Sequence, residues 1–519
     1  MEDDAARSRQ TRELRRRDLL KQAALAGVTA SIATGDRAQA DNEAGAADRP
    51  RPFIDAYPDQ LSYAPGEDAA LHVSTSAPRY SVAVTRLGAR DQKVWSRENL
   101  NGADHPVPEQ ASMQGCEWPV AVHVPLAREW QSGYYRVELT GMLPGGQTVK
   151  NESFFVLRSV RPGKGAKILL QFATNTYQAY NQWGGSSLYS GSQFTQVSLN
   201  RPLMIREPPV RYRDDSFNPN YWCAHAWELP FIRWAEAAGY LLDYSVNGDL
   251  EFHPEILSGC RLVLSVGHDE FWSAPMRDNL EKFIAAGGNV AFMSGNTCCW
   301  QVRFEDHGRT MVCWKAAYLF DPVFKTGDHR LLSTLWCSPF VRRPENGMTG
   351  VGFVYGGYNG FFGEFTKGPE AGAYTVHRPD HWILADTGLK RGDEIGSRAG
   401  IVGYECDGCE FDMVEGLPVP TGRDGTPEDF QILATGTARW SEADGSLNKS
   451  QLLRALLHGG QPPEKVSSYK TRPGCAVLGT YTRGGTVFTT GSTDWAHGLA
   501  SGDRIVDRIT RNVLDRLST

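Results

Sequence analysis

The sequence predicts an α/β protein in which an N-terminal β-sandwich precedes a doubly wound, mostly parallel α/β domain. Three observations favour this fold class. Short alternating strands fill residues 53–160, buried strands alternate with helices over residues 161–519, and 519 residues suffice for two to four domains. We therefore expect the sandwich at 53–160 and the α/β domain at 161–519.

Alternation of apolar and polar residues identifies the first strands. Residues 71–75 (LHVST) and 80–84 (YSVAV) alternate as half-buried strands do, and residues 130–139 (WQSGYYRVEL) read as a turn that leads into a strand. Strands of this length and spacing are typical of a sandwich.

A different pattern begins after residue 161. Residues 167–172 (KILLQF) form an apolar run, as expected for a strand buried on both faces. Strand 261–266, helix 274–286 and strand 289–293 then follow one another, and this order indicates a parallel sheet. Residues 310–468 are rich in glycine and turns and are interpreted as a long elaboration of this domain.

The N-terminus predicts export by the twin-arginine route. Residues 16–21 (RRDLLK) match the twin-arginine pattern, a modest apolar stretch follows, and residues 38–40 (AQA) offer a cleavage site. The apolar stretch is too short to span a membrane. We expect a signal peptide at 1–40, a linker at 41–52, and no membrane association after cleavage.

Composition argues against two classes of function. The net charge is -6 and no basic stripe follows the leader, so the chain is not expected to bind nucleic acid. Ten cysteines are too few for a disulfide scaffold. The single C-x-x-C, at residues 406–409, lacks the second knuckle of a zinc site and favours a local disulfide or packed thiols.

Three strand ends carry unusual polar and aromatic residues. They are residues 177–189 (YQAYNQWGGSSLY), 267–272 (GHDEFW) and 294–300 (SGNTCCW). The carboxyl ends of parallel strands meet at one edge of a sheet, so we expect these segments to form one site.

Two of these motifs, together with residues 287–297 (GGNVAFMSGNT), resemble those of the large-subunit family of N,N-dimethylformamidase. The resemblance covers most of the chain from about residue 53. It implies an α/β domain related to class I glutamine amidotransferases and hydrolysis of a small amide by one Fe(III) ion. It also leaves open a homo-oligomer or a small partner subunit.

The resemblance assigns the site residue by residue. Fe(III) is a hard cation that prefers phenolate and carboxylate oxygens. Tyr177 remains an alternative for the first tyrosine, and Glu270 could instead cap the helix that begins near residue 273. The implied iron ligands are Tyr180, Tyr189 and Glu270, and the implied catalytic residues are His268, Asn296 and Glu405.

Two other classes of function stay open. The first is a cysteine-dependent amidohydrolase, because Cys298 lies near a strand-to-helix turn, although no glycine follows two residues after it. The second is a non-catalytic exported protein that binds a carbohydrate or a peptide. Iron content separates both from the amide hydrolase.

Overall fold

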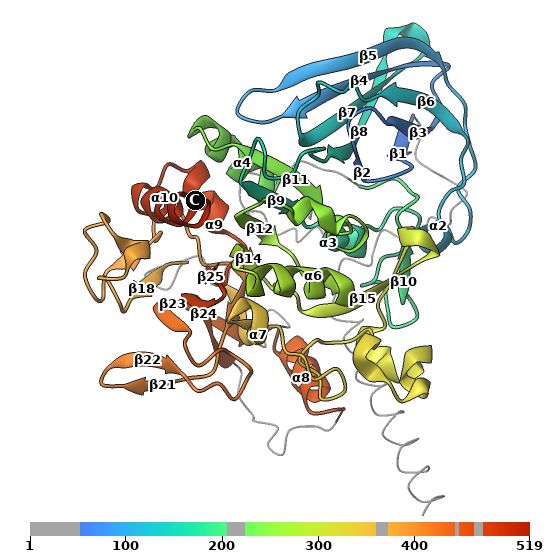
Figure 1. The fold of residues 1–519 in the computed structure, drawn as a ribbon. Coiled ribbons are helices and arrows are strands. Elements are labelled where there is room, and N and C mark those ends of the chain that lie inside the picture. Colours follow the sequence, from blue (N-terminus) through green and yellow to red (C-terminus); the bar gives the residue numbers. More distant parts are fainter. Residues whose placement is uncertain (1–51, 205–223, 360–371, 442–445, 461–470) are drawn as a thin grey trace, which may run out of the picture.

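The computed structural model describes residues 52–204, 224–359, 372–441, 446–460 and 471–519 (Figure 1). The predicted signal peptide and nearly all of the predicted linker lie outside these ranges. Within the described residues, no helix combines the length and the apolar character needed to cross a membrane.

The N-terminal part consists of two sheets that enclose a core of their own. Apolar side chains from both sheets meet in this core, including Ile54, Leu71, Val84 and Phe155. The strands expected between residues 53 and 160 are therefore present. The first sheet contains β1 (Ile54–Pro58), β3 (Asp68–Thr75) and β6 (Val120–Pro125), and the second contains β2 (Ser62–Tyr63), β8 (Thr148–Leu157), β7 (Gly133–Met142), β4 (Arg79–Leu87) and β5 (Gln92–Asn101).

A large central sheet organises the rest of the chain. Its first five strands are parallel, in the order β11 (Leu242–Val246), β9 (Ile168–Phe172), β12 (Leu262–His268), β14 (Asn289–Gly295) and β25 (Gly485–Thr489). Antiparallel pairing then continues through β24 (Thr471–Arg483), β23 (Gln431–Ser441), β17 (Gly352–Asn359) and β20 (Tyr404–Gly408). In addition, β18 (Tyr374–Val376) pairs with β23, and β19 (Glu394–Ile395) pairs with β18.

The prediction of a mostly parallel sheet is wrong for this second half. Strands β24 and β25 pair directly across Gly484, whose φ of +81° suits a tight turn, so these neighbours run antiparallel. Residues 310–468 contribute five strands, β17, β18, β19, β20 and β23, to the sheet. The segment is thus part of the domain's framework, and the fold is mixed α/β and rich in sheet.

Helices cover both faces of the parallel half. Figure 1 shows α6 (Ala274–Ala285) and α10 (Arg504–Leu517) on opposite sides of β14. Helix α9 (Trp495–Ala500) packs against α4 (Glu228–Ala237). Ser273 caps α6 by accepting a hydrogen bond from the Met276 amide, so Glu270 is not the cap. The other α-helices are α2 (Ala111–Gln114), α3 (Thr174–Tyr180), α5 (Asp249–Phe252), α7 (Asn346–Thr349) and α8 (Ser446–Leu457).

Two smaller sheets complete the structure. One is four-stranded, with β10 (Gln196–Ser198), β16 (Thr310–Val312), β15 (Trp300–Glu305) and β13 (Phe271–Ser273), and the other pairs β21 (Phe411–Val414) with β22 (Leu417–Pro420). Because β13 and β15 follow the ends of β12 and β14, the four-stranded sheet lies beside the carboxyl edge of the parallel strands.

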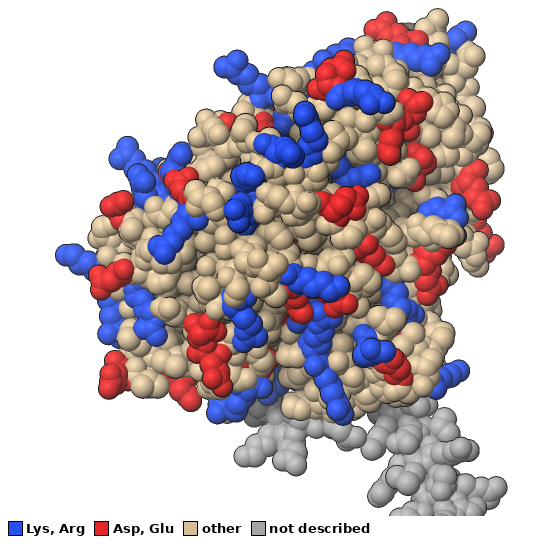
Figure 2. Space-filling model, in the orientation of Figure 1, with Lys and Arg blue, Asp and Glu red and all other residues tan. Residues whose placement is uncertain are grey.

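Buried ion pairs join the N-terminal sheets to the α/β part. Arg158 contacts Asp249 at 3.2 Å, and the Ser62 hydroxyl donates to the same carboxylate at 2.8 Å. Arg86 pairs with Glu236 at 2.7 Å. Paired buried charges are costly to separate, so these contacts fix the two parts against each other. On the face shown in Figure 2, charges of both signs are interspersed.

Candidate active site

The three predicted motifs meet at the carboxyl edge of the parallel strands. His268 ends β12 and lies opposite Gly295 at the end of β14, and α3 follows β9 with Tyr180 as its last residue. Strand β20 crosses this edge from far along the sequence. A Cβ atom at Gly295 would lie only 2.4 Å from the carbonyl oxygen of Glu405. A glycine at residue 295 therefore allows Glu405 to reach the site.

Tyr180, Tyr189 and Glu270 come together, as the resemblance implies. The Tyr189 hydroxyl donates to Glu270 Oε1 at 2.5 Å, and the Tyr180 and Tyr189 rings stack with centroids 4.4 Å apart. Tyr189 exposes 37% of its surface, but its hydroxyl points inward to a carboxylate that is 2% exposed. Three oxygen-bearing side chains from two motifs thus lie next to one another in a buried site.

Tyr177, the alternative first tyrosine, lies elsewhere. Its hydroxyl donates to Glu228, and its ring packs edge-on against Phe154, 6.3 Å away. Tyr177 and Tyr180 are three residues apart on α3, and Tyr180 is the one that stacks on Tyr189. The structure therefore groups Tyr180, not Tyr177, with Tyr189 and Glu270.

The environment of these oxygens disfavours negative charge. Burial, followed by the charge of Glu270, raises the pKa of Tyr180 and of Tyr189 well above the usual range. Burial likewise raises the pKa of Glu270, although His268 opposes the shift. All three upward shifts disfavour the ionised forms, and a bound cation would favour them.

His268 forms a second cluster with Glu405 and Asn296. His268 Nε2 lies 2.7 Å from Glu405 Oε2 and 3.5 Å from Glu270 Oε2, and the Asn296 amide donates to Glu405 at 3.1 Å. Burial lowers the pKa of His268, but Glu405 outweighs it and the net shift is upward. For Glu405, burial raises the pKa and His268 outweighs it, so the net shift is downward. Both shifts favour an imidazolium–carboxylate pair.

Asp407 holds Asn296 in place, and the sequence reasoning missed it. Its two carboxylate oxygens accept from the backbone amides of Asn296, at 2.9 Å, and Thr297, at 3.0 Å. Asn296 has a φ of +50°, an uncommon conformation for a residue other than glycine. Glu405 and Asp407 are two residues apart on one strand and therefore face the same side. That spacing was the only signal in the sequence.

Trp300 and Lys315 were also missed. The Trp300 indole donates to Glu270 Oε1 at 2.8 Å, and the Lys315 ammonium lies 3.6 Å from the centroid of the Tyr189 ring. The same ammonium donates to the carbonyl of Leu188. Burial lowers the pKa of Lys315 to about 8. A cation beside the tyrosine and carboxylate oxygens offsets part of their negative charge.

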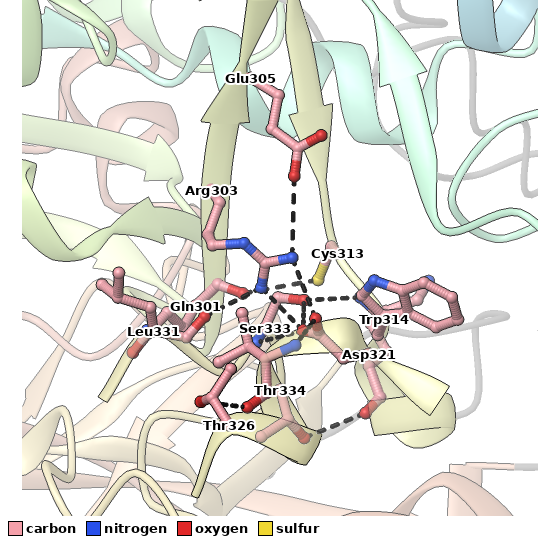
Figure 3. Close-up of polar contacts among 12 residues, drawn as sticks. Gln301, Arg303, Glu305, Cys313, Trp314, Asp321, Thr326, Leu331, Ser333 and Thr334 are labelled. Atoms are coloured by element: carbon pink, nitrogen blue, oxygen red, sulfur yellow. Dashed lines mark hydrogen bonds and ion pairs between the residues drawn. The ribbon is translucent and has the colours of Figure 1, made fainter. Parts of the chain in front are cut away.

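A polar cluster around Arg303, Asp321 and Ser333 (Figure 3) fixes the backbone of Lys315. Lys315 begins the 3-10 helix η6 (Lys315–Phe320), and its amide donates to Ser333 O at 2.9 Å. The Ser333 hydroxyl donates to Asp321 at 2.8 Å, and Arg303 pairs with Asp321 at 2.7 Å. These contacts hold Lys315, with its φ of +48°, over Tyr189.

The cysteines do not resemble nucleophiles. Cys298 is fully buried, and burial raises its pKa far above the usual range, as it does for Cys299. A thiolate, not a thiol, is the nucleophile in cysteine catalysis. The nine described cysteines, including Cys406 and Cys409, are free thiols.

The donor set fits a hard cation that accepts tyrosine ligands. Glu270 Oε2 and Asn296 Oδ1 are buried with no hydrogen-bond partner among the described residues, and such atoms are expected where a ligand binds. In the ranges that the structure describes, no three His, Cys, Asp or Glu side chains are grouped to hold a metal ion. A metal ion here would thus depend on Tyr180 and Tyr189.

Comparison with known proteins gives the family. The family model described as N,N-dimethylformamidase beta subunit-like, C-terminal, matches residues 81–508. The chain belongs to this family. The match spans every site residue described above, so members of the dimethylformamidase beta subunit-like family provide the relevant comparison.

Two curated relatives are named N,N-dimethylformamidase beta subunit. The protein from Alcaligenes sp is 24% identical over 368 residues, and that from Paracoccus aminophilus is 24% identical over 365 residues. These matches cover 66% and 65% of this chain but 42% of each relative. The chain therefore spans less than half the length of either relative.

The matches to solved structures are weak. A structure of murine CRIg matches 21% of this chain and 98% of its own, at 16% identity and a TM-score of 0.15. A sialyltransferase from Photobacterium damsela matches 45% of this chain and 35% of its own, at 7% identity and a TM-score of 0.11. Scores this low carry no argument about fold or function.

Proposed function

We propose that this protein hydrolyses a small amide at the site formed by Tyr180, Tyr189, Glu270, His268 and Glu405, with one ferric ion as its cofactor. The observation that carries the proposal is the convergence of two tyrosine oxygens and a carboxylate beside a histidine–carboxylate pair. Membership of the dimethylformamidase-like family supports amide hydrolysis as the reaction class.

Tyr180, Tyr189 and Glu270 would hold the ion. When bound, Fe(III) would supply Lewis acidity toward the amide carbonyl and the attacking water. Phenolate and carboxylate oxygens suit a hard trivalent cation. Trp300 donates to the Glu270 oxygen that also accepts from Tyr189, and this contact orients the carboxylate.

His268 and Glu405 would move the proton. Hydrolysis adds the hydroxyl of water to the acyl carbon, breaks the C–N bond, and transfers a proton to the departing amine. In the imidazolium–carboxylate pair, whose atoms lie 2.7 Å apart, Glu405 can accept the proton of water and His268 can deliver a proton to nitrogen. Asn296 has a second amide hydrogen, beyond the one donated to Glu405, that can stabilise the developing oxyanion.

The wider assembly and fold kinship belong to the same proposal. Both relatives are named as beta subunits, so we expect this chain to work as a homo-oligomer or with a small partner subunit. We also propose that the five parallel strands of the central sheet are related to those of class I glutamine amidotransferases.

Replacing Tyr189 with phenylalanine tests the metal site. Tyr189→Phe keeps the ring and its stacking on Tyr180 but removes the oxygen that reaches Glu270. We expect wild-type protein, expressed with ample iron, to contain about one iron per chain and to show a visible tyrosinate charge-transfer band. Tyr189→Phe should lose the iron, the band and the hydrolysis of N,N-dimethylformamide and similar small amides, with little change in melting temperature.

Tyr177→Phe is the matched control. Its hydroxyl contacts Glu228 and not Glu270, so this variant should keep its iron and its band. Wild-type protein without iron or band, or a Tyr189→Phe variant that binds iron as well as wild type, would contradict the proposal. The non-catalytic binding protein would then be favoured.

His268→Ala separates proton transfer from metal binding. The imidazole ring contacts Glu405 more closely than Glu270. We expect iron content and the visible band to be retained while kcat falls on the order of a hundredfold or more, since general acid–base catalysis contributes about this much. Equal kcat in the variant and the wild type would remove His268 from the mechanism.

A further inference from the structure

A cavity lies between the N-terminal sheets and the α/β part, and none of the active-site residues lines it. It encloses about 510 Å³, which is within the range of small-molecule sites, and such sites occur preferentially at domain interfaces. The ion pair between Arg86 and Glu236 lies near this cavity, which we call the seam cavity, and fixes α4 against the sandwich. The cavity is lined by Leu87, Arg136, His225, Leu229, Pro230, Arg233, Trp234, Leu499 and Ala500.

The polar lining of this seam cavity is basic. Its charged or titratable lining residues are Arg136, Arg233 and His225, and no aspartate or glutamate is among the lining residues. The acidic partners of these groups stand outside the lining. Arg136 contacts Glu138 at 3.1 Å, Arg233 contacts Asp91 at 3.1 Å, and His225 lies 3.5 Å from Glu152.

Arg136 offers an unused donor. Its outer nitrogen donates to Glu138, but its Nε atom is buried with no hydrogen-bond partner among the described residues. A buried donor without a partner is unfavourable by itself and is often satisfied by a ligand or water. The Nε–H group of a guanidinium can donate a charge-assisted hydrogen bond to one oxygen of a carboxylate.

The remaining lining is apolar. Leu87, Leu229 and Leu499 are nearly inaccessible to solvent, and Pro230, Trp234 and Ala500 complete the wall. A free phosphate is strongly hydrated and gains little from such a wall. A carboxylate attached to an apolar body can use both the arginines and the apolar surface.

Another cavity in the described part of the chain shows the contrast. It encloses about 640 Å³ and is lined by Arg423 and Arg483, but also by Glu428 and Asp429. Mixed charge in that cavity favours neither anionic nor cationic ligands, whereas the basic lining of the seam cavity favours anionic ones.

We propose that the seam cavity is a binding site for an organic monocarboxylate with an apolar body. The inference is independent of the amide hydrolase proposal, because it concerns other residues. Arg136 pairs with the carboxylate, Arg233 adds a second positive charge, and Leu229, Trp234 and Leu499 contact the apolar body.

Calorimetric titration of the full chain with phenylacetate tests the site. Acetate, which has the charge without the body, and 2-phenylethanol, which has the body without the charge, should each bind at least tenfold more weakly. Arg136→Met should weaken phenylacetate at least tenfold, since a hydrogen bond between charged groups is worth about that factor or more. Arg136→Lys should lie between Arg136→Met and wild type, and Arg233→Met should also weaken binding.

Two controls complete the experiment. Arg330 is an exposed arginine that pairs only locally with Asp328, so Arg330→Met should bind phenylacetate as wild type does. Tyr189→Phe should also retain binding, which separates the seam cavity from the active site. The proposal is overturned by absence of phenylacetate binding up to about 10 mM, by equal affinity for 2-phenylethanol, by unchanged affinity in Arg136→Met and Arg233→Met, or by loss of binding in Tyr189→Phe.

Discussion

Two carboxylates of strand β20 accept hydrogen bonds from the turn after β14, and these contacts fix the position of Asn296. Glu405 accepts from the side-chain amide of Asn296, while Asp407 accepts from the backbone amides of Asn296 and Thr297. Burial raises the pKa of Asp407 to about 7. Asp407 is a positioning residue in this arrangement, because it acts on the site only through Asn296.

Asp407→Asn tests this positioning role. The substituted amide keeps the size of the side chain but can accept only one of the two backbone hydrogen bonds. We expect kcat for amide hydrolysis to fall about ten- to a hundredfold with little change in KM, because the displaced group acts on the transition state. The loss of a buried hydrogen bond should cost about 1 to 3 kcal/mol of unfolding free energy.

Asp424→Asn controls for simple destabilisation. Asp424 is also buried and accepts hydrogen bonds, from the Glu410 amide and from the side chain of Asn346, away from the site. It should lose comparable stability but keep kcat. Equal loss of kcat in both variants would show that Asp407 has a structural role alone.

The sequence predicted those site residues that sit in long motifs. Tyr180, Tyr189, Glu270 and His268 belong to such motifs, and the structure brings them together. Asp407 and Lys315 act through contacts between segments distant in sequence, so no local pattern marks them. Glu405 lies in a short motif, and its place beside His268 depends on the close approach at Gly295.

At the scale of elements, the loop that carries Lys315 depends on one buried ion pair. Asp321 is inaccessible to solvent and accepts from Arg303, from the Val323 amide and from the Ser333 hydroxyl. Burial alone would raise the pKa of Asp321, but Arg303 outweighs it and the net shift is downward. The cluster therefore favours the ionised carboxylate in the folded protein.

Asp321→Asn should show the pH dependence of this cluster. A carboxyl whose pKa is lower when folded adds stability above its unfolded pKa, about 3.9, and loses it as pH falls through the folded pKa. At pH 7 we expect the variant to be about 2 kcal/mol less stable than wild type. Thermal unfolding from pH 7 to pH 3 should show this difference shrinking toward zero, and a constant difference would contradict the assignment.

The elements themselves were predicted unevenly. The helix expected at 274–286 is α6 (Ala274–Ala285), because its cap and periodicity mark it locally. Three of the five parallel strands, β9, β12 and β14, were also predicted. The antiparallel half was not, because residues 310–468 lack strong periodicity and pairs such as β17 with β23 join segments far apart in the chain.

At the scale of the whole molecule, export stays a prediction from the leader. Residues 16–21 lie outside the described residues, so the twin-arginine pattern needs a direct test. Arg16→Lys together with Arg17→Lys should leave uncleaved precursor in the cytoplasm, because the route depends on the arginine pair. Fractionation followed by immunoblotting measures this. Unchanged export of the double variant would remove the prediction, and a Lys21→Arg variant serves as the charge-matched control.

Sheet order has a consequence for synthesis of the chain. Strand β25 (Gly485–Thr489) pairs with β14 in the middle of the central sheet, although it lies near the C-terminus. During translation, the edge of β14 (Asn289–Gly295) that pairs with β25 therefore stays unpaired while almost 200 further residues are synthesised. Such edges invite pairing with other chains. A ribosome that stops before residue 485 releases a chain with an exposed edge, so this protein should depend on chaperones until its last few dozen residues have emerged.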